Sequence, residues 1–334
     1  MKVYTIRDIV EQAGVSVTTV SRVLNNRPDV SADTVKKVRR VMEACRFVVN
    51  PNARGLKQAE QEIIAAIIRG RNNPFLNALS EEIVLCRQPG KAALITEYID
   101  EEDDEFRHAL SLLRRRRVAG LIFVGSRIDE RSAVLDGISL PMVFATVSTV
   151  GTPMERASSV SMDDRKMACE AVTELLKRGH RKIAVFGGER WGQDSLALRA
   201  QGAEDAFRAM DLPFADERYV KTRLTLSDAY AAALEHFSRC PDSTAAFCMG
   251  DSAALGVIRA LADLGLRVPQ DVSVMGVDGI DIGRYTTPRL STVAQPVKEI
   301  ARQSMKVLSD LIENGGPPRH VTVKAALEIR ESVR

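Results

Sequence analysis

Hydrophobic residues recur at helical spacing three times within the first 45 residues of the chain. The spacing predicts helices over residues 6–13, from 17 to about 25, and from 32 to 45, the last two after the capping residues Ser16 and Ser31. Gly14 ends the first helix, and the turn that follows is so short that it must form a sharp corner. Two short helices about such a turn predict a helix-turn-helix, and the third completes a small all-α headpiece.

From Glu62 onward, short β-rich runs alternate with helical stretches. The candidate strands are residues 63–70, 92–99, 120–126, 141–148, 182–188, 219–221, 245–251 and 272–279. This βαβ rhythm is typical of doubly wound parallel sheets, here in two consecutive halves. No Gly-x-Gly-x-x-Gly, Walker or Gly-x-Ser-x-Gly string stands in a suitable context. The pattern therefore predicts a ligand held between two lobes, at the carboxyl ends of the strands.

The charge is distributed unevenly between these regions. Residues 1–58 carry eleven Lys and Arg against five Asp and Glu, a net charge of +6, so the rest of the chain carries −3 of the total of +3. A small basic module on an acidic body indicates a polyanionic partner, since phosphate neutralisation supplies most non-specific affinity for nucleic acid. A merely solvated basic helix is the alternative on charge alone.

The composition limits the remaining classes of protein. Hydrophobic residues make up 45% and charged residues 27% of the 334, no apolar run is long enough for a membrane span, and the start of the chain has no leader pattern. We therefore expect a cytoplasmic protein without membrane contact. Five scattered cysteines and four histidines predict neither disulfides nor a metal site, and nothing in the sequence indicates a cofactor.

The second helix of a helix-turn-helix enters the major groove, and the outward residues near its start meet base edges. These residues are Val17, Thr18, Ser21 and Arg22. Arg22 is the strongest candidate because its fork can pair with guanine N7 and O6, and a phosphate contact is its alternative role. Thr5 and Asn25 are better placed for the DNA backbone.

The string TIRDIVEQAGVSVTTVSRVLNN, with the later ARGLK, resembles the headpiece of the LacI/GalR family of bacterial transcription regulators. The resemblance implies a homodimer on a pseudo-palindromic double-stranded operator, joined through a short hinge helix that lies in the minor groove. In that hinge Leu56 would be inserted at a base step, with Ala53 and Lys57 beside it. A linker role is the alternative for Leu56. The proline that usually precedes the hinge asparagine here follows it, as Pro51.

The body resembles the periplasmic-binding-protein-like effector domain of the same family. The resemblance is carried by strings such as Asn73-Pro74-Phe75, Met162-Asp163-Asp164, Met249-Gly250-Asp251 and Thr287-Pro288. Carried over by position, the effector contacts would be Phe75, Asp163, Arg199, Asp251 and Asp278, with Ser126, Gln193, Ser195 and Leu224 lining the cleft. Arg71, Asn73 and Arg127, which stand beside these positions, are further candidates. Arg199 offers a planar fork for paired oxygens, and Asp163 and Asp278 offer acceptors for hydroxyl groups. An Arg–Asp lock that only ties the lobes together is the alternative.

Arginines near the expected cleft bear on the class of effector. Arg69, Arg71 and Arg127 would favour an anion, so a sugar acid or a sugar phosphate is the leading candidate, ahead of a neutral sugar. Side chains directed to solvent, a purine-like corepressor, or a protein partner are the alternatives. The run Arg114–Arg117 ends a predicted helix, where cations complement the helix dipole, and we interpret it in that way rather than as a second DNA contact.

Together these observations predict a DNA-binding regulator, most simply a repressor of a carbohydrate or sugar-acid operon, rather than an enzyme. The expected parts are the headpiece at 1–46, a hinge helix and linker at 47–59, a first lobe at 60–161 plus 293–319, and a second lobe at 162–292 plus 320–334.

Overall fold

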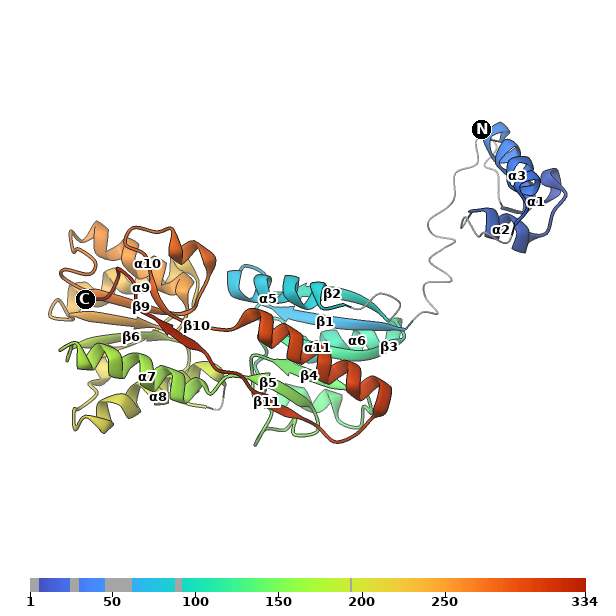
Figure 1. Ribbon diagram of the computed structural model, residues 1–334. Coiled ribbons are helices and arrows are strands. Elements are labelled where there is room, and N and C mark those ends of the chain that lie inside the picture. The colour runs from blue at the N-terminus through green and yellow to red at the C-terminus, as the bar shows by residue number, and fades with distance from the viewer. Residues whose placement is uncertain (1–5, 25–29, 46–61, 88–91, 193) are drawn as a thin grey trace. The chain divides into compact units, whose positions relative to one another are not determined.

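The computed structural model describes residues 6–24, 30–45, 62–87, 92–192 and 194–334. The chain forms two compact units, Met1–Gln61 and Glu62–Arg334 (Figure 1). No helix within the described ranges is long and apolar enough to cross a membrane.

The first unit contains the three expected helices, α1 (Ile6–Ala13), α2 (Val17–Leu24) and α3 (Ala32–Ala44). Ser16 Oγ accepts a hydrogen bond from Thr19 N at 3.1 Å, and Ser31 Oγ caps α3 through Thr34 N. Their apolar faces form one small core, whose buried members are Ile9, Ala13, Val20, Val23, Val38 and Cys45. The local caps and the apolar spacing therefore account for this headpiece.

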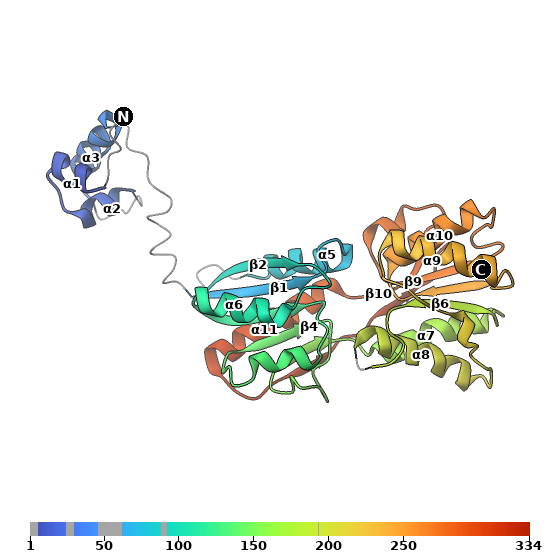
Figure 2. The same cartoon turned by 180° about the vertical axis from the view of Figure 1, so that it is seen from behind.

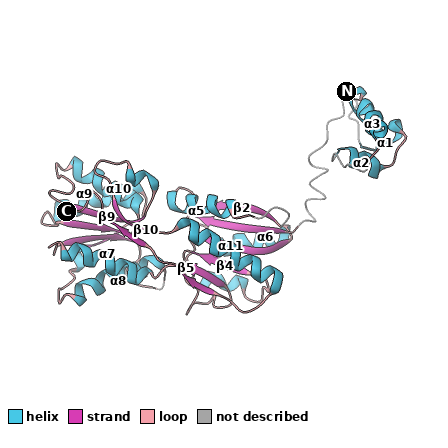
Figure 3. Cartoon of the chain, in the orientation of Figure 1, coloured by secondary structure: helices cyan, strands magenta, loops and turns pink. Residues whose placement is uncertain are grey.

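The second unit has two lobes, in each of which strands alternate with helices (Figure 3). Across the first sheet the strands are β11 (His320–Thr322), β5 (Ser158–Ser161), β4 (Met142–Ala145), β3 (Val118–Val124), β1 (Ile63–Arg69) and β2 (Ala93–Ile99). All five pairings are parallel. Helices α5 (Pro74–Leu85) and α11 (Val297–Asn314) pack on one face, while α6 (Glu105–Arg115) and the 3₁₀ helix η1 (Glu130–Leu135) pack on the other.

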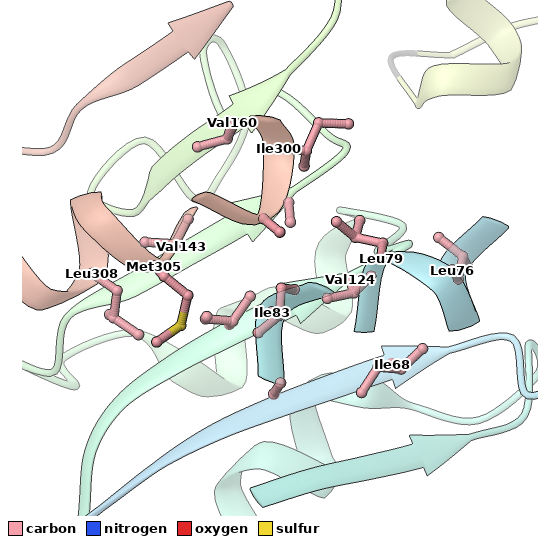
Figure 4. Close-up of a cluster of buried hydrophobic side chains, with 14 of the residues drawn as sticks. Ile68, Leu76, Leu79, Ile83, Val124, Val143, Val160, Ile300, Met305 and Leu308 are labelled. Atoms are coloured by element: carbon pink, nitrogen blue, oxygen red, sulfur yellow. The ribbon is translucent and has the colours of Figure 1, made fainter. Parts of the chain in front are cut away.

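The core of the first lobe lies between this sheet and its helices. Leu79 and Ile83 of α5 and Leu308 of α11 pack against Val124 and Val143 of the sheet (Figure 4). All five side chains are fully buried. Burial of each stabilises the fold by roughly 1.5–3 kcal/mol, which fixes the strand ends that face the second lobe.

The second lobe has the same architecture as the first. Across its sheet the strands are β12 (Ala326–Glu328), β10 (Ser291–Ala294), β9 (Ser273–Asp278), β8 (Ala245–Cys248), β6 (Ile183–Gly187) and β7 (Tyr219–Lys221). Only the edge strand β12 pairs antiparallel among these described strands. Helices α7 (Asp164–Lys177) and α8 (Ser195–Ala209) cover one face, and α9 (Leu226–Arg239) and α10 (Asp251–Asp263) cover the other.

The chain passes between the lobes after β5, between β10 and α11, and between β11 and β12 (Figure 2). The lobe boundaries expected at 293 and 320 are a few residues too early. Strand β10 continues to Ala294 in the second sheet, and β11, up to Thr322, pairs with β5 of the first. Backbone pairing across each sheet, rather than local sequence, decides where these crossings fall.

Candidate functional site

A cavity of about 660 Å³ lies between the lobes of the second unit. Its walls come from the segments that follow β1, β2, β3 and β4 in the first lobe and β6, β7, β8 and β9 in the second. Parallel strands place their carboxyl ends at one edge of a sheet, so the two sheets offer these ends to a common space. The volume suits a small molecule.

Eight of the twelve expected effector residues line this cavity: Asn73, Phe75, Ser126, Arg127, Ser195, Arg199, Leu224 and Asp278. Gln193 lies outside the described residues. The other three, Arg71, Asp163 and Asp251, do not line it.

Arg199 is the central cation of the cavity. Its side chain is 8% exposed, its Nε donates to Asp164 Oδ1 at 2.7 Å and its Nη1 donates to Met249 O at 2.6 Å. Within the described residues its Nη2 makes no hydrogen bond, so one arm of the fork remains for a ligand. Gly202 on the same helix allows this geometry, because a Cβ there would lie 2.0 Å from Arg165 O on α7.

The partner of Arg199 is Asp164, and Asp163, which we expected to contact the effector, does not line the cavity. Asp163 is exposed and caps α7, with Oδ1 accepting from Lys166 N at 2.9 Å. Asp164, the first residue of α7, is 3% exposed and faces α8. The close packing of α7 on α8 turns the second of the two acids inward.

Asp278 and Gln295 form a second polar group in the cavity wall. Gln295 Nε2 donates to Asp278 Oδ1 at 2.7 Å, and within the described residues no group bonds the buried Gln295 Oε1. Burial raises the pKa of Asp278, although the charge of Arg199 opposes the shift. The backbone of Asp278 has φ of +123°, and Thr146 in the opposite wall has φ of +83°. Such strain at non-glycine residues gathers at functional sites.

Asp251 has a structural rather than a ligand-binding role, which corrects the expectation. It is fully buried, and its Oδ2 accepts from Gly279 N at 2.8 Å and Ile280 N at 2.9 Å. Its Oδ1 accepts from Thr292 Oγ1 at 2.7 Å. Asp251 therefore fixes the backbone that follows Asp278 and does not reach the cavity.

The three arginines that favoured an anionic effector lie in different environments. Arg71 points away from the cavity, donating from Nη2 to Tyr98 O at 3.1 Å beside Asp100. Arg69 lines the cavity, donates from Nη2 to Glu101 O, and has a buried Nε without a partner in the described part of the chain. Arg127 faces Asp194 at 3.9 Å. Two of the three, Arg69 and Arg127, therefore line the cavity.

Contacts between the lobes cross the mouth of the cavity. Arg223 Nη2, after β7, lies 3.5 Å from Glu101 Oε2 and 3.4 Å from Glu102 Oε1, both after β2. Ser195 Oγ donates to Thr146 O at 3.4 Å. Together with the Arg127–Asp194 pair, these contacts join the two lobes without passing through either core.

The headpiece presents the expected face of α2. Val17 is 50% exposed, and Thr18 and Arg22 are exposed, while Val20 and Val23 face the core. The side chain of Ser21 is not among those described. Thr5, Asn25, Ala53, Leu56 and Lys57 lie outside the described residues.

Comparison with known proteins gives the family. Residues 5–50 match the bacterial regulatory proteins of the lacI family, and residues 172–333 match the periplasmic binding protein-like domain. The HTH-type transcriptional regulator MalR of Clostridium butyricum is 30% identical over 336 residues, which cover 98% of each chain. The chain belongs to the LacI family. It is a DNA-binding transcriptional regulator, as its relatives are, and not an enzyme.

Two solved structures of LacI-family regulators share its architecture. The transcriptional regulator CelR in complex with cellobiose is 25% identical, with a TM-score of 0.73 over 98% of this chain and 99% of that one. The Lac repressor dimer bound to operator and the anti-inducer ONPF has a TM-score of 0.77 over 99% of each chain at 24% identity, which shows the fold.

Several cavity residues of this LacI-family regulator escaped the sequence analysis. Glu101, Glu102 and Arg223 follow strands, but as exposed charges they look like any solvated loop. Gln295 lies between β10 and α11, where the chain passes from one lobe to the other, and the hydrophobic periodicity of the sequence does not indicate this segment. The position directly after a strand was the one signal available for Glu101, and nothing local indicated Gln295.

Proposed function

We propose that this LacI-family regulator is a repressor that binds a pseudo-palindromic operator as a homodimer and responds to a sugar or sugar acid in the cavity between its lobes. One observation supports this most: Arg199, Asp278 and Gln295 are fixed in one wall with hydrogen-bonding capacity left over. Among the described residues Nη2 of Arg199 bonds no acceptor and Oε1 of Gln295 bonds no donor. A hydroxyl group can serve as either.

The rest of the lining supports a polyhydroxylated molecule of low charge. Five cations (Arg69, Arg127, Arg199, Lys221 and Arg223) stand among five carboxylates (Glu101, Glu102, Glu189, Asp194 and Asp278). Four of the cations lie within 4 Å of a carboxylate, and the fifth, Arg69, donates to a carbonyl. A doubly charged sugar phosphate would have to break such pairs, so a neutral sugar or a singly charged sugar acid fits better than the phosphate. Phe75, Leu76 and Leu224 supply apolar contact for the carbon skeleton.

A homodimer would cover apolar side chains that the single chain leaves exposed. Leu85 on α5 is 75% exposed, and Ile282 and Tyr285 in the second lobe are 57% and 78% exposed. Large exposed apolar side chains are typical of surfaces that bind a partner. Two headpieces would then read two half-sites.

Ligand control requires that the effector bind one arrangement of the lobes more tightly than the other. The contacts from Arg127, Ser195 and Arg223 join the lobes across the cavity, so a ligand between them changes the balance between arrangements. The relative position of the lobes would in turn set the spacing of the two headpieces.

The test is fluorescence anisotropy of a labelled palindromic duplex from upstream of the gene, at fixed salt, with sugars, sugar acids, sugar phosphates and purines. We expect specific binding that one sugar or sugar acid abolishes. Stronger binding in the presence of a purine would make the protein a corepressor-dependent regulator. Specific binding indifferent to every compound would contradict the small-molecule part and favour a protein partner.

The headpiece is tested with Arg22→Ala and the matched control Lys36→Ala on α3. Arg22→Ala should lower operator affinity about 10- to 100-fold with little effect on random DNA, because a base contact carries the sequence preference. Lys36→Ala should weaken binding to the operator and to random DNA to the same extent. Equal losses on both duplexes for Arg22→Ala would assign it to phosphate binding.

A further inference from the structure

The loop between β6 and α8 contributes to the cavity on both sides of Arg190. Gly188 and Glu189 line the cavity directly before it, and Asp194, the N-cap of α8, lines it afterwards. Arg190 itself does not line the cavity. Asp194 is held by its own helix, because its side chain caps α8. The preceding residues 188–192 must therefore be held by other contacts.

Arg190 turns away from the cavity and binds two carboxylates. Its side chain is 19% exposed. Nε donates to Glu204 Oε1 on α8 at 2.6 Å, and Nη1 donates to Asp216 Oδ1 at 2.7 Å, in the 3₁₀ helix η2 (Asp216–Arg218). Neither carboxylate lines the cavity. The guanidinium thus ties the middle of the loop to two elements of the same lobe.

Three aromatic rings lie around the same guanidinium. Its Cζ is 5.0 Å from the ring centroid of Trp191, 5.2 Å from that of Phe214 and 5.5 Å from that of Tyr219. Cation–π attraction is strongest where the charge is shielded from water, as that of Arg190 is. The rings and the two carboxylates together hold Arg190 more firmly than an exposed ion pair would.

Two hydrogen bonds anchor the loop backbone on either side of Arg190. Tyr219 Oη donates to Gly188 O at 3.0 Å, and Gln201 Nε2 donates to Gly192 O at 3.1 Å. Tyr219 contacts the loop twice, through its ring and through its hydroxyl group. The cation, the ring and the loop backbone therefore form one connected network.

On the cavity side this loop presents Glu189. Its Oε1 lies 2.5 Å from Lys221 Nζ, and both side chains line the cavity. Their side chains are 51% and 66% exposed, so the contact between them contributes little to holding either one. The position of Glu189 depends instead on its backbone, which Arg190 fixes from the next residue.

We propose that Arg190 is a positioning residue for effector binding, which holds residues 188–192 so that Glu189 stands in the cavity wall before the effector binds. Arg190 does not touch the effector, and the inference rests on the proposed effector site. A preformed wall raises affinity because binding does not have to order the loop. Trp191, the single tryptophan of the chain, lies against Arg190, so its fluorescence reports on the loop.

The test compares the full-length wild-type protein with Arg190→Gln and Arg190→Lys. The probe is the sugar or sugar acid that releases the wild-type protein from its operator, and calorimetry gives its affinity. Arg190→Gln should bind the probe roughly tenfold more weakly, since residues of one network are coupled to this extent. Arg190→Lys keeps the charge but loses the planar fork, so it should restore part of the affinity and bind about threefold more weakly than wild type.

Acrylamide quenching of Trp191 separates positioning from a merely structural role. In the wild-type protein we expect the same quenching with and without the probe, because the loop is already fixed. In Arg190→Gln, quenching should be stronger without the probe and should fall when the probe binds. Unchanged affinity of folded Arg190→Gln for the probe would overturn the inference. Wild-type protein that binds its operator but none of the compounds would instead contradict the proposed effector site.

A matched control is Arg218→Gln. The Arg218 side chain is 11% exposed and pairs with Asp242, before the amino end of β8 and outside the cavity. This variant should lower the melting temperature as Arg190→Gln does, but leave the affinity for the probe unchanged. If it loses as much affinity, the cause is general destabilisation of the lobe and the inference fails. Should Arg190→Gln unfold, Glu204→Gln, which keeps the shape of one partner, must weaken probe binding about threefold.

Discussion

The two lobes share one strand order but supply different groups to the cavity. In the second lobe the ligand-facing groups are buried and fixed: Arg199 is held by Asp164, and Asp278 by Gln295. In the first lobe the side chain of Arg127 is 49% exposed, and its carboxylate partner, Asp194, belongs to the other lobe. The second lobe thus supplies buried, fixed polar groups to the cavity, whereas Arg127 of the first lobe is half-exposed and pairs across the lobes.

Both lobes nevertheless stabilise a cavity loop in the same way. Glu105, the first residue of α6, accepts from Ser126 Oγ and Arg127 N at 2.9 Å each. Asp251, the first residue of α10, accepts from Gly279 N, Ile280 N and Thr292 Oγ1. Burial raises the pKa of both carboxyl groups. The lobes therefore differ in the groups these loops present, not in how the loops are held.

The largest expected effect tests these loop supports. Asp251→Ala should lower the free energy of unfolding by about 3 kcal/mol, because the buried N–H of Ile280 loses its acceptor and the half-buried N–H of Gly279 keeps only Thr292 Oγ1, at 3.3 Å. Urea unfolding measures it, with Thr292→Val as a control that should cost about 1 kcal/mol. Glu105→Ala should lower the free energy of unfolding by less than Asp251→Ala does. A larger loss for Glu105→Ala would contradict this order of loop support in the two lobes.

The next effect tests which lobe holds the ligand. Arg199→Lys should weaken effector binding about 10- to 100-fold, since the charge stays but the planar fork is lost. Calorimetric titration with the effector measures the change. Arg165→Lys on α7, whose Arg165–Asp205 pair lies outside the cavity, is the matched control and should leave affinity unchanged. If Arg127→Lys in the first lobe proves as damaging as Arg199→Lys, the two lobes share the ligand equally.

The smallest expected effect tests the contacts of Arg223 that join the two lobes. Arg223→Gln should weaken effector binding by at most about fivefold, because exposed ion pairs contribute up to about 1 kcal/mol, and the loss should vanish at high salt. Lys221→Gln is the control: it removes a cation from the same cavity, but its partner Glu189 is in the same lobe. If both variants lose the same amount of effector affinity, the affinity depends on the charge of the cavity and not on the contact between the lobes.

Much of the fold followed from local patterns in the chain. Capping at Ser16 and Ser31, the apolar stripes of the headpiece and the βαβ alternation are each encoded within a few residues, so the three headpiece helices and eight strands of the body were predicted near their observed bounds, whereas α11 was not predicted. The resemblance to the family named Ser126, Leu224 and Asp278, in agreement with the carboxyl-end rule, and all three line the cavity. The short strands β5, β10, β11 and β12 were not predicted, because three or four residues carry too little alternation to mark a strand and their pairing is decided by the sheet as a whole.

The sequence by itself determined the family, the helix-turn-helix, the two-lobed body and eight of the cavity-lining residues, since these depend on spacing and on strings of adjacent residues. Only the tertiary structure decided which of Asp163 and Asp164 turns inward, that Asp251 supports a loop, and that Arg71 faces away. It also brought Arg223 to Glu101 and Glu102 across the lobes. Side-chain direction and contacts between distant segments depend on how helices and sheets pack, which no local pattern encodes.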